Sequence, residues 1–121
     1  MPRKAVSMTD ETRNDRERAE AAELEPLTGK QRRFLRGLGH NLSPALYVGK
    51  EGISDAVVAA LDEALLTHEL VKVKLGQNVA EDRKDAAASL AEGTSSHIAQ
   101  ILGNTILVYR KHPEKPRLKL P

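Results

Sequence analysis

Several residue types that define particular classes of protein are missing or scarce in this chain of 121 residues. It has no cysteine, which excludes disulfides and thiolate chemistry. It also has no tryptophan, one phenylalanine and two tyrosines, so a core must be built from leucine, valine, isoleucine and alanine. No apolar run approaches the roughly 20 residues of a membrane-spanning helix. The charged N-terminus has no apolar signal-peptide region, so a cytoplasmic protein is expected.

Composition divides the chain into three parts. Residues 1–25 are charged and poor in branched apolar and aromatic residues, which predicts a disordered N-terminal extension. A compact domain is expected over residues 26–112, followed by a basic C-terminal tail over residues 113–121. The extension holds 5 Lys/Arg and 7 Asp/Glu, a net charge of −2. Residues 26–121 hold 14 Lys/Arg and 10 Asp/Glu, a net charge of +4. A moderately basic domain is compatible with a polyanion partner, although many unrelated domains are equally basic.

Hydrophobic periodicity predicts helices and strands in the order α-β-α-β-α-β-β. Helices are expected over residues 29–40, 54–69 and 81–94, strands over 45–48 and 70–75, and two more strands around Gly103-Asn104 within residues 97–111. Right-handed crossovers would place the second and third helices against one face of the sheet. The fold class is therefore α/β, more narrowly an α+β two-layer sandwich in which helices pack on a four-stranded mixed sheet.

The first predicted helix has an apolar arc and a basic arc. On a helical wheel the apolar arc contains Phe34, Leu35 and Leu38, and the opposite arc contains Arg32, Arg33, Arg36 and His40. A solvated outer face and a phosphate-facing helix both fit this pattern. The strand LVKVKL alternates strictly, so Lys72 and Lys74 share a largely wet face. They add to the same basic surface only if that face lies on the side of the arginines.

The stretch GKEG, residues 49–52, lies between a predicted strand and a predicted helix. Free N–H groups at a helix N-terminus favour an anion, and glycine lets backbone approach a ligand closely. Gly49, Lys50 and Gly52 could therefore grip a phosphate. A plain tight turn with solvated Lys50 and Glu51 explains the same residues, and Glu51 counts against phosphate unless its side chain turns away.

The sequence does not indicate catalytic chemistry. The histidines, at positions 40, 68, 97 and 112, are not spaced as metal ligands. Asp62 and Glu63 are adjacent on a helix and point in different directions, so they do not form a general acid/base pair. GKEG also lacks the Lys-Ser/Thr ending of a nucleotide-binding P-loop. We expect no enzyme activity, no cofactor, no metal and no small-molecule substrate.

Four stretches carry a resemblance to a known family: LTGKQRRFLRGLGHNLSPALYVGKEGI, HELVKVKL, LGNTILVYR and the closing KLP. In this order and spacing they resemble the YhbY family, the stand-alone bacterial form of the CRM domain. The resemblance covers roughly four-fifths of the chain and excludes the N-terminal extension. It implies a fold similar to the C-terminal domain of a translation initiation factor, and RNA binding tied to assembly of the large ribosomal subunit.

The resemblance also implies that the GxxG loop clamps nucleic-acid backbone as the loop of KH domains does, a role that falls on Gly49, Lys50 and Gly52. The other expected RNA contacts are Lys30, Arg32, Arg33, Arg36, Lys72 and Lys74. Because aromatic residues are scarce, recognition is expected to rely on backbone and shape rather than on a base-stacking sheet. We expect a monomer that binds ribosomal RNA or the pre-50S particle and no membrane. The alternative is a protein-interaction module that joins the ribosome or a translation factor.

Overall fold

The computed structural model describes residues 26–79 and 81–121 and has the predicted order of elements. The helices are α2 (Gly29–Gly39), α3 (Asp55–His68) and α4 (Arg83–Thr94). The strands are β1 (Leu46–Val48), β2 (Leu70–Leu75), β3 (His97–Leu102) and β4 (Thr105–Tyr109). These bounds confirm the predicted elements, with small differences at their ends. The extension predicted over residues 1–25 lies outside the described residues.

The four strands form one mixed sheet in the order β1-β2-β4-β3. β1 pairs with β2 in parallel, whereas β4 is antiparallel to both β2 and β3. Gly103, with a φ of 58°, makes the tight turn between β3 and β4, as its position first in Gly103-Asn104 predicts. The mixed sheet is therefore confirmed, and β2 lies in its interior beside both neighbours.

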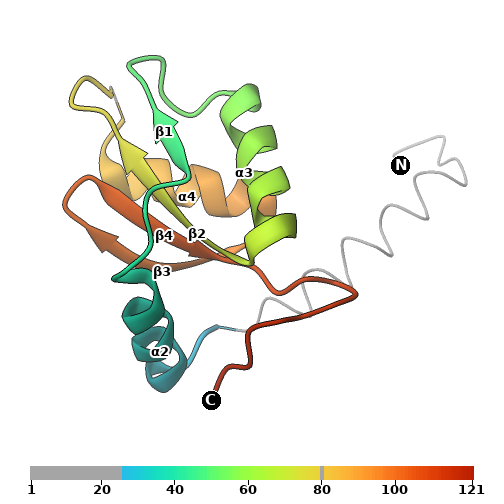
Figure 1. Cartoon of the computed structure of the whole chain (residues 1–121). Helices are drawn as coiled ribbons and strands as arrows, with labels where there is room; N and C mark the ends of the chain where they lie inside the picture. The colour runs from blue at the N-terminus through green and yellow to red at the C-terminus, as the bar shows by residue number, and fades with distance from the viewer. Residues whose placement is uncertain (1–25, 80) are drawn as a thin grey trace, which may run out of the picture.

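The sheet separates two hydrophobic clusters, one under α3 and α4 and one under α2. Figure 1 shows these helices arranged around the sheet. On one face α3 and α4 pack together, with Leu61, Leu65 and Leu90 buried against Val73 and Val108, as expected for the crossover helices. On the other face α2 contacts β2, β3 and β4. Its cluster is smaller and is made of Leu35, Leu70, Ala99, Leu107 and Tyr109. The helix α2 thus adds a partial layer to the predicted sandwich.

The buried side of α2 differs from the apolar arc that the helical wheel gives. Leu35 is fully buried, but Phe34 and Leu38 are 38% and 40% exposed. The reason is Gly39, where an added Cβ would lie only 2.6 Å from Cδ2 of Leu107. Because Gly39 has no side chain, this side of α2 approaches β4 closely, and the apolar arc turns partly towards solvent.

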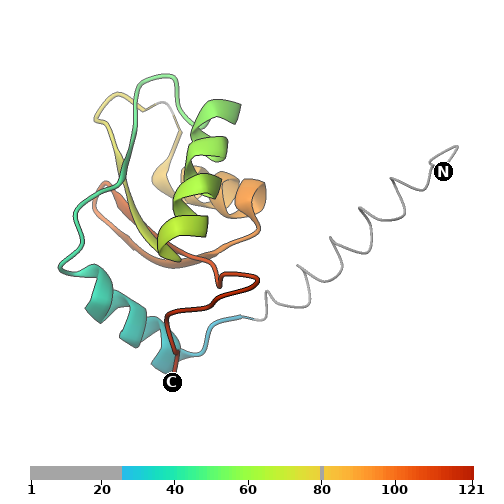
Figure 2. The ribbon, with the colours of Figure 1, turned by 45° about the vertical axis from the view of Figure 1, so that its right-hand side comes forward.

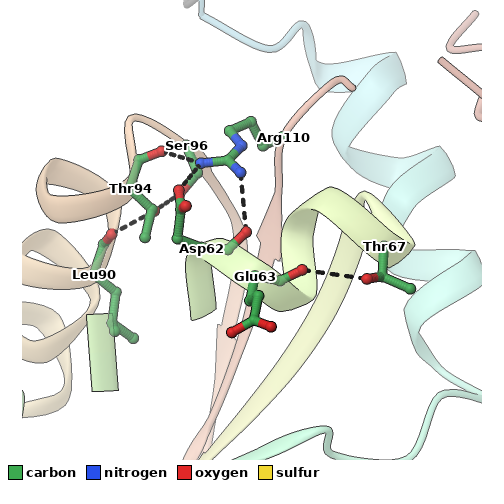
Figure 3. Close-up of polar contacts among 7 residues, drawn as sticks. All are labelled: Asp62, Glu63, Thr67, Leu90, Thr94, Ser96 and Arg110. Atoms are coloured by element: carbon green, nitrogen blue, oxygen red, sulfur yellow. Dashed lines mark hydrogen bonds and ion pairs between the residues drawn. The ribbon is translucent and has the colours of Figure 1, made fainter. Parts of the chain in front are cut away.

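Arg110, which follows β4, joins the middle of α3 to the end of α4 (Figure 3). Its guanidinium donates to the carboxylate of Asp62 at 2.6 Å and to the carbonyl of Thr94 at 2.7 Å. A further bond of 3.1 Å reaches the carbonyl of Asp62. The side chain of Asp62 therefore forms an ion pair that connects α3 to the residue after β4.

The C-terminal residues pack against the domain. Leu118 and Leu120 contact the α2 cluster, and Gln31 of α2 donates to the carbonyl of Pro121 at 3.3 Å. The carboxylate of Glu69, which is only 2% exposed, accepts the backbone N–H groups of this segment. These donors are His112, Arg117 and Leu118, at 2.8 to 2.9 Å. Figure 2 shows the segment returning to the start of α2.

Candidate nucleic-acid interface

The exposed side of α2 is basic. Thr28 caps the helix through a reciprocal capping box with Gln31, which fixes its first turn. Four cations then project from the helix and are all exposed: Lys30, Arg32, Arg33 and Arg36. Residues 26–50 contain five Lys or Arg and no Asp or Glu. Neighbouring acids of the same segment therefore cannot neutralise these cations.

Lys72 and Lys74 lie on the same side of the sheet as α2. In the sheet, Lys72 pairs with Leu107, which belongs to the α2 cluster. Side chains alternate along a strand, so Lys74 projects from that face as well. Lys72 is half-buried and Lys74 is exposed. The two lysines therefore lie on the side of the α2 arginines and extend their basic surface. We call the six cations of α2 and β2 the basic face: Lys30, Arg32, Arg33, Arg36, Lys72 and Lys74.

The opposite face has the opposite charge. With the N-cap of α4 included, α3 and α4 carry six acidic residues: Asp55, Asp62, Glu63, Asp82, Asp85 and Glu92. The same segments contain two Lys or Arg residues, Arg83 and Lys84, and Arg110 pairs with Asp62 from outside them. The modest charge of the whole chain thus hides two faces of opposite sign. A polyanion is attracted to the α2 side and repelled from the α3/α4 side.

His97 lies near the basic face but adds no charge to it at neutral pH. His97 lies on β3, and its ring stacks on Tyr109 with centroids 6.2 Å apart. Burial lowers the pKa of His97, and the nearby positive charge of Arg32 lowers it further. The imidazole of His97 is therefore mainly neutral at pH 7.

The GKEG loop lies at the edge of the basic face, directly after β1. The amide of Gly52 donates to the carbonyl of Gly49 at 3.0 Å and closes the turn. The amide of Gly76, after β2, donates to the carbonyl of Val48 at 2.8 Å and fastens the loop to the sheet. Gly49 and Lys50 are exposed, as a phosphate contact requires, but Gly52 is buried with a φ of 78°. Gly52 therefore shapes the loop from inside.

Glu81, a residue that sequence analysis missed, contacts the loop. Its carboxylate accepts the amide of Ile53 through Oε1 at 3.1 Å and Oε2 at 3.4 Å. An added Cβ on Gly52 would lie 1.9 Å from Oε1, so only glycine leaves room for this approach. The acid that meets the loop backbone is thus Glu81, whereas Glu51 is exposed. No local pattern links positions so distant in sequence.

The structure brings most of the predicted contacts together. The six residues of the basic face share one side of the molecule, and Gly49 and Lys50 lie at its edge. Gly52 is the exception, because it is turned towards Glu81. Within residues 26–79 and 81–121, no group of three or more histidine, aspartate or glutamate side chains is arranged to hold a metal ion. No helix in this part of the chain is long and apolar enough to cross a membrane.

Comparison with known proteins gives consistent matches. The family model described as the CRS1/YhbY (CRM) domain matches residues 27–110. YqeI of Bacillus subtilis, named a probable RNA-binding protein, is 44% identical over 95 residues, which are 78% of this chain and 99% of YqeI. PA4753 of Pseudomonas aeruginosa, also named a probable RNA-binding protein, is 39% identical over 78% of this chain and 89% of its own length. The solution structure of SAV1595 from Staphylococcus aureus superposes with a TM-score of 0.68 at 41% identity, covering 78% of this chain and 99% of that one.

Proposed function

This chain belongs to the CRS1/YhbY (CRM) domain family, and on that premise we propose that it is a non-catalytic RNA-binding protein. The observation that carries the proposal is the basic face, where six cations from α2 and β2 lie on one side without an acidic residue on either element's exposed side. RNA binding begins with such clusters, because neutralised phosphates release counterions. The names of the relatives YqeI and PA4753 support the same function.

In the proposed mechanism, the GKEG loop grips a phosphate at the edge of the basic face. The exposed Gly49 backbone and the ammonium of Lys50 make the contact, and buried Gly52 holds the turn in shape. Lys74 lies one residue before the end of β2, beside the loop, so a strand of RNA can pass from the loop onto the basic face. Approach from this side avoids the acidic side chains of α3 and α4.

We propose ribosomal RNA precursors or pre-50S particles as the targets, with a role in assembly of the large ribosomal subunit. This part rests on the family resemblance. Its test is sedimentation of a cell extract, with the chain detected across the gradient. Co-migration with free large-subunit precursors is the expected result, whereas exclusive migration with small subunits or at the top of the gradient contradicts it.

One observation favours the alternative of a protein-interaction module. Phe34, Leu38 and Leu42 leave 38%, 40% and 38% of their surfaces exposed beside the arginines of α2. Exposed apolar side chains in a group are typical of protein contacts. In that case RNA affinity is weak and does not depend on the loop.

The loop is best tested with Gly49→Asp. An added Cβ on Gly49 meets no atom within 4 Å, whereas one on Gly52 collides with Glu81, so only the first substitution leaves the fold intact. We expect RNA affinity to fall about tenfold, because the new carboxylate repels the phosphate; tenfold is about 1.4 kcal/mol. Filter binding or fluorescence anisotropy at several salt concentrations measures the change.

The matched control is Ala88→Asp, which adds the same charge at an exposed position of α4. It should leave RNA affinity nearly unchanged. Equal affinities for the wild type and Gly49→Asp contradict the role of the loop. If the wild-type chain binds no RNA at low salt, the protein-interaction module is the better explanation.

A further inference from the structure

Tyr47 is an aromatic side chain that the fold does not use. It lies in β1 and is 69% exposed, more than Phe34 at 38% and far more than Tyr109 at 4%. Aromatic residues in sheets ordinarily stabilise a protein by burying their large rings. The other two residues of β1 are packed: Val48 is in the main core, and Leu46 contacts it. The exposed ring of Tyr47 is therefore available to a ligand.

The surroundings of Tyr47 follow from the strand register. Tyr47 pairs with Lys74, Lys74 with Thr105, and Thr105 with Leu102, so these four side chains form a row across the sheet. The row lies on the α2 face, because Val48 and Leu75, the next pair along, point into the opposite core. Leu102 at the far end is 66% exposed. At about 4.8 Å per strand, the two exposed ends of the row are roughly 14 Å apart.

This row occupies the part of the face that α2 leaves open. Through Leu35 the helix packs over Leu70 and Tyr109, which pair with each other at the opposite end of β2 and β4. Gly49 follows Tyr47 by two residues, a rise of about 7 Å along a strand. A ligand on the Tyr47 ring is therefore close to both the GKEG loop and Lys74.

We propose that Tyr47 stacks on an unpaired base of single-stranded RNA while the adjacent phosphate contacts Lys74 and the GKEG loop. This inference rests on the proposed function and names its substrate class. A ligand at this place needs an apolar face to cover the Tyr47 ring and a negative charge to match Lys72 and Lys74. A nucleotide fulfils both demands, because its flat base is joined to a phosphate. Base–aromatic stacking with a cationic groove is how single strands are commonly held.

The proposal predicts a preference for single strands. A base in a duplex is already stacked between its neighbours, and its face cannot reach Tyr47 without unpairing, which costs a few kcal/mol. Phosphates of a duplex can still contact the basic face. Tyr47 should therefore contribute to the binding of single strands and contribute little to the binding of duplexes.

The test uses a short single-stranded RNA that contains 2-aminopurine, an adenine analogue whose fluorescence is quenched by stacking. We expect the wild type and Tyr47→Phe to quench it, because both rings stack. Tyr47→Ala should lose the quenching and bind the single strand about 5- to 100-fold more weakly. Its affinity for duplex RNA of the same length should stay unchanged. Leu66→Ala, at an exposed apolar residue of α3, is the control and should behave as the wild type.

The outcomes separate this inference from the function on which it rests. If Tyr47→Ala binds the single strand as the wild type does while Gly49→Asp binds weakly, stacking is overturned and the loop proposal stands. An equal loss on single and duplex RNA also overturns stacking, because it indicates a general effect on the surface. If the wild type binds neither RNA, the proposed function and this inference fail together.

Discussion

At the scale of single residues, Gly52 and Glu81 determine the chemistry at the start of α3. The positive φ of Gly52 and its missing side chain let the Glu81 carboxylate reach the amide of Ile53. Ile53 precedes the N-cap Ser54, so the carboxylate satisfies a part-buried backbone donor of the loop that leads into the helix. It also places a negative charge beside the loop for which we propose a phosphate contact. The two effects oppose each other in RNA binding.

A substitution that separates these effects is Glu81→Gln. The amide oxygen of glutamine can still accept the N–H of Ile53, so the loop keeps its shape, while the negative charge is removed. We expect RNA affinity to rise about two- to fivefold at low salt, a size usual for one partly screened charge. Anisotropy titrations with the same RNA as for Gly49→Asp measure it. Weaker binding would show that the charge of Glu81 helps to order the loop.

At the scale of elements, the C-terminal segment closes the α2 layer through Glu69. This residue connects α3 to β2 with a φ of 61°, a conformation that is costly for a side chain larger than glycine. Burial alone would raise the pKa of Glu69, but the backbone N–H groups of His112, Leu118 and Arg117 hold it below its ordinary value of 4.5. The ionised carboxylate is therefore the form that fastens the segment.

We predict that Glu69→Gln destabilises the domain by roughly 2–4 kcal/mol at neutral pH. Glutamine has one acceptor oxygen, and its NH₂ group would face the N–H of His112 or of Arg117 and Leu118. Since the folded pKa of Glu69 is depressed, its contribution is complete above pH 4.5 and is lost as the pH falls through the folded value. Urea unfolding between pH 7 and pH 3 should show the difference between wild type and variant shrinking with acid. A constant difference contradicts this role.

The same scale shows what local pattern can predict. Thr28 and Ser54 are confirmed as N-caps, because capping depends on residues within one turn. The alternation of LVKVKL predicts β2 over Leu70–Leu75, and Gly103-Asn104 predicts the hairpin. The apolar arc of α2 does not reveal how far Phe34 and Leu38 are exposed, since the packing of Gly39 on Leu107 depends on a strand far away in sequence.

At the scale of the whole molecule, the separation of charge decides which side RNA can approach. The sequence gives the number of charges, but the sides on which they lie depend on the strand order β1-β2-β4-β3 and on the placement of α2. For the same reason, the sequence alone does not reveal whether Lys72 and Lys74 lie on the same side of the sheet as the arginines of α2. The contact of Glu81 with the loop and the exposure of Tyr47 follow from tertiary structure in the same way.

The two faces yield a prediction about salt. Arg36 lies on the basic face and Lys84 lies on α4. Each is exposed and carries one positive charge, so the two can be compared directly. Arg36→Gln should reduce the slope of log K against log salt by about 0.7 for single-stranded RNA, and the triple change of Arg32, Arg33 and Arg36 to Gln by about 2. Lys84→Gln should leave the slope unchanged. If Arg36→Gln and Lys84→Gln give equal slopes, RNA has no preference for the basic face, and the proposed surface is contradicted.

The contact between Glu69 and the last residues of the chain also has a consequence for biosynthesis. A chain leaves the ribosome from its N-terminus, so α2, α3 and the sheet emerge before residues 112–121. Until residues 112–121 emerge, the carboxylate of Glu69 lacks the backbone N–H groups of His112, Arg117 and Leu118. The α2 cluster likewise lacks Leu118 and Leu120. The core of the α3/α4 layer needs residues up to β4, because Ile106 and Val108 belong to it, whereas the layer that carries the arginines also needs residues 112–121. Among the described layers, the one that supports the proposed RNA-binding surface is therefore the last to receive all its residues during synthesis.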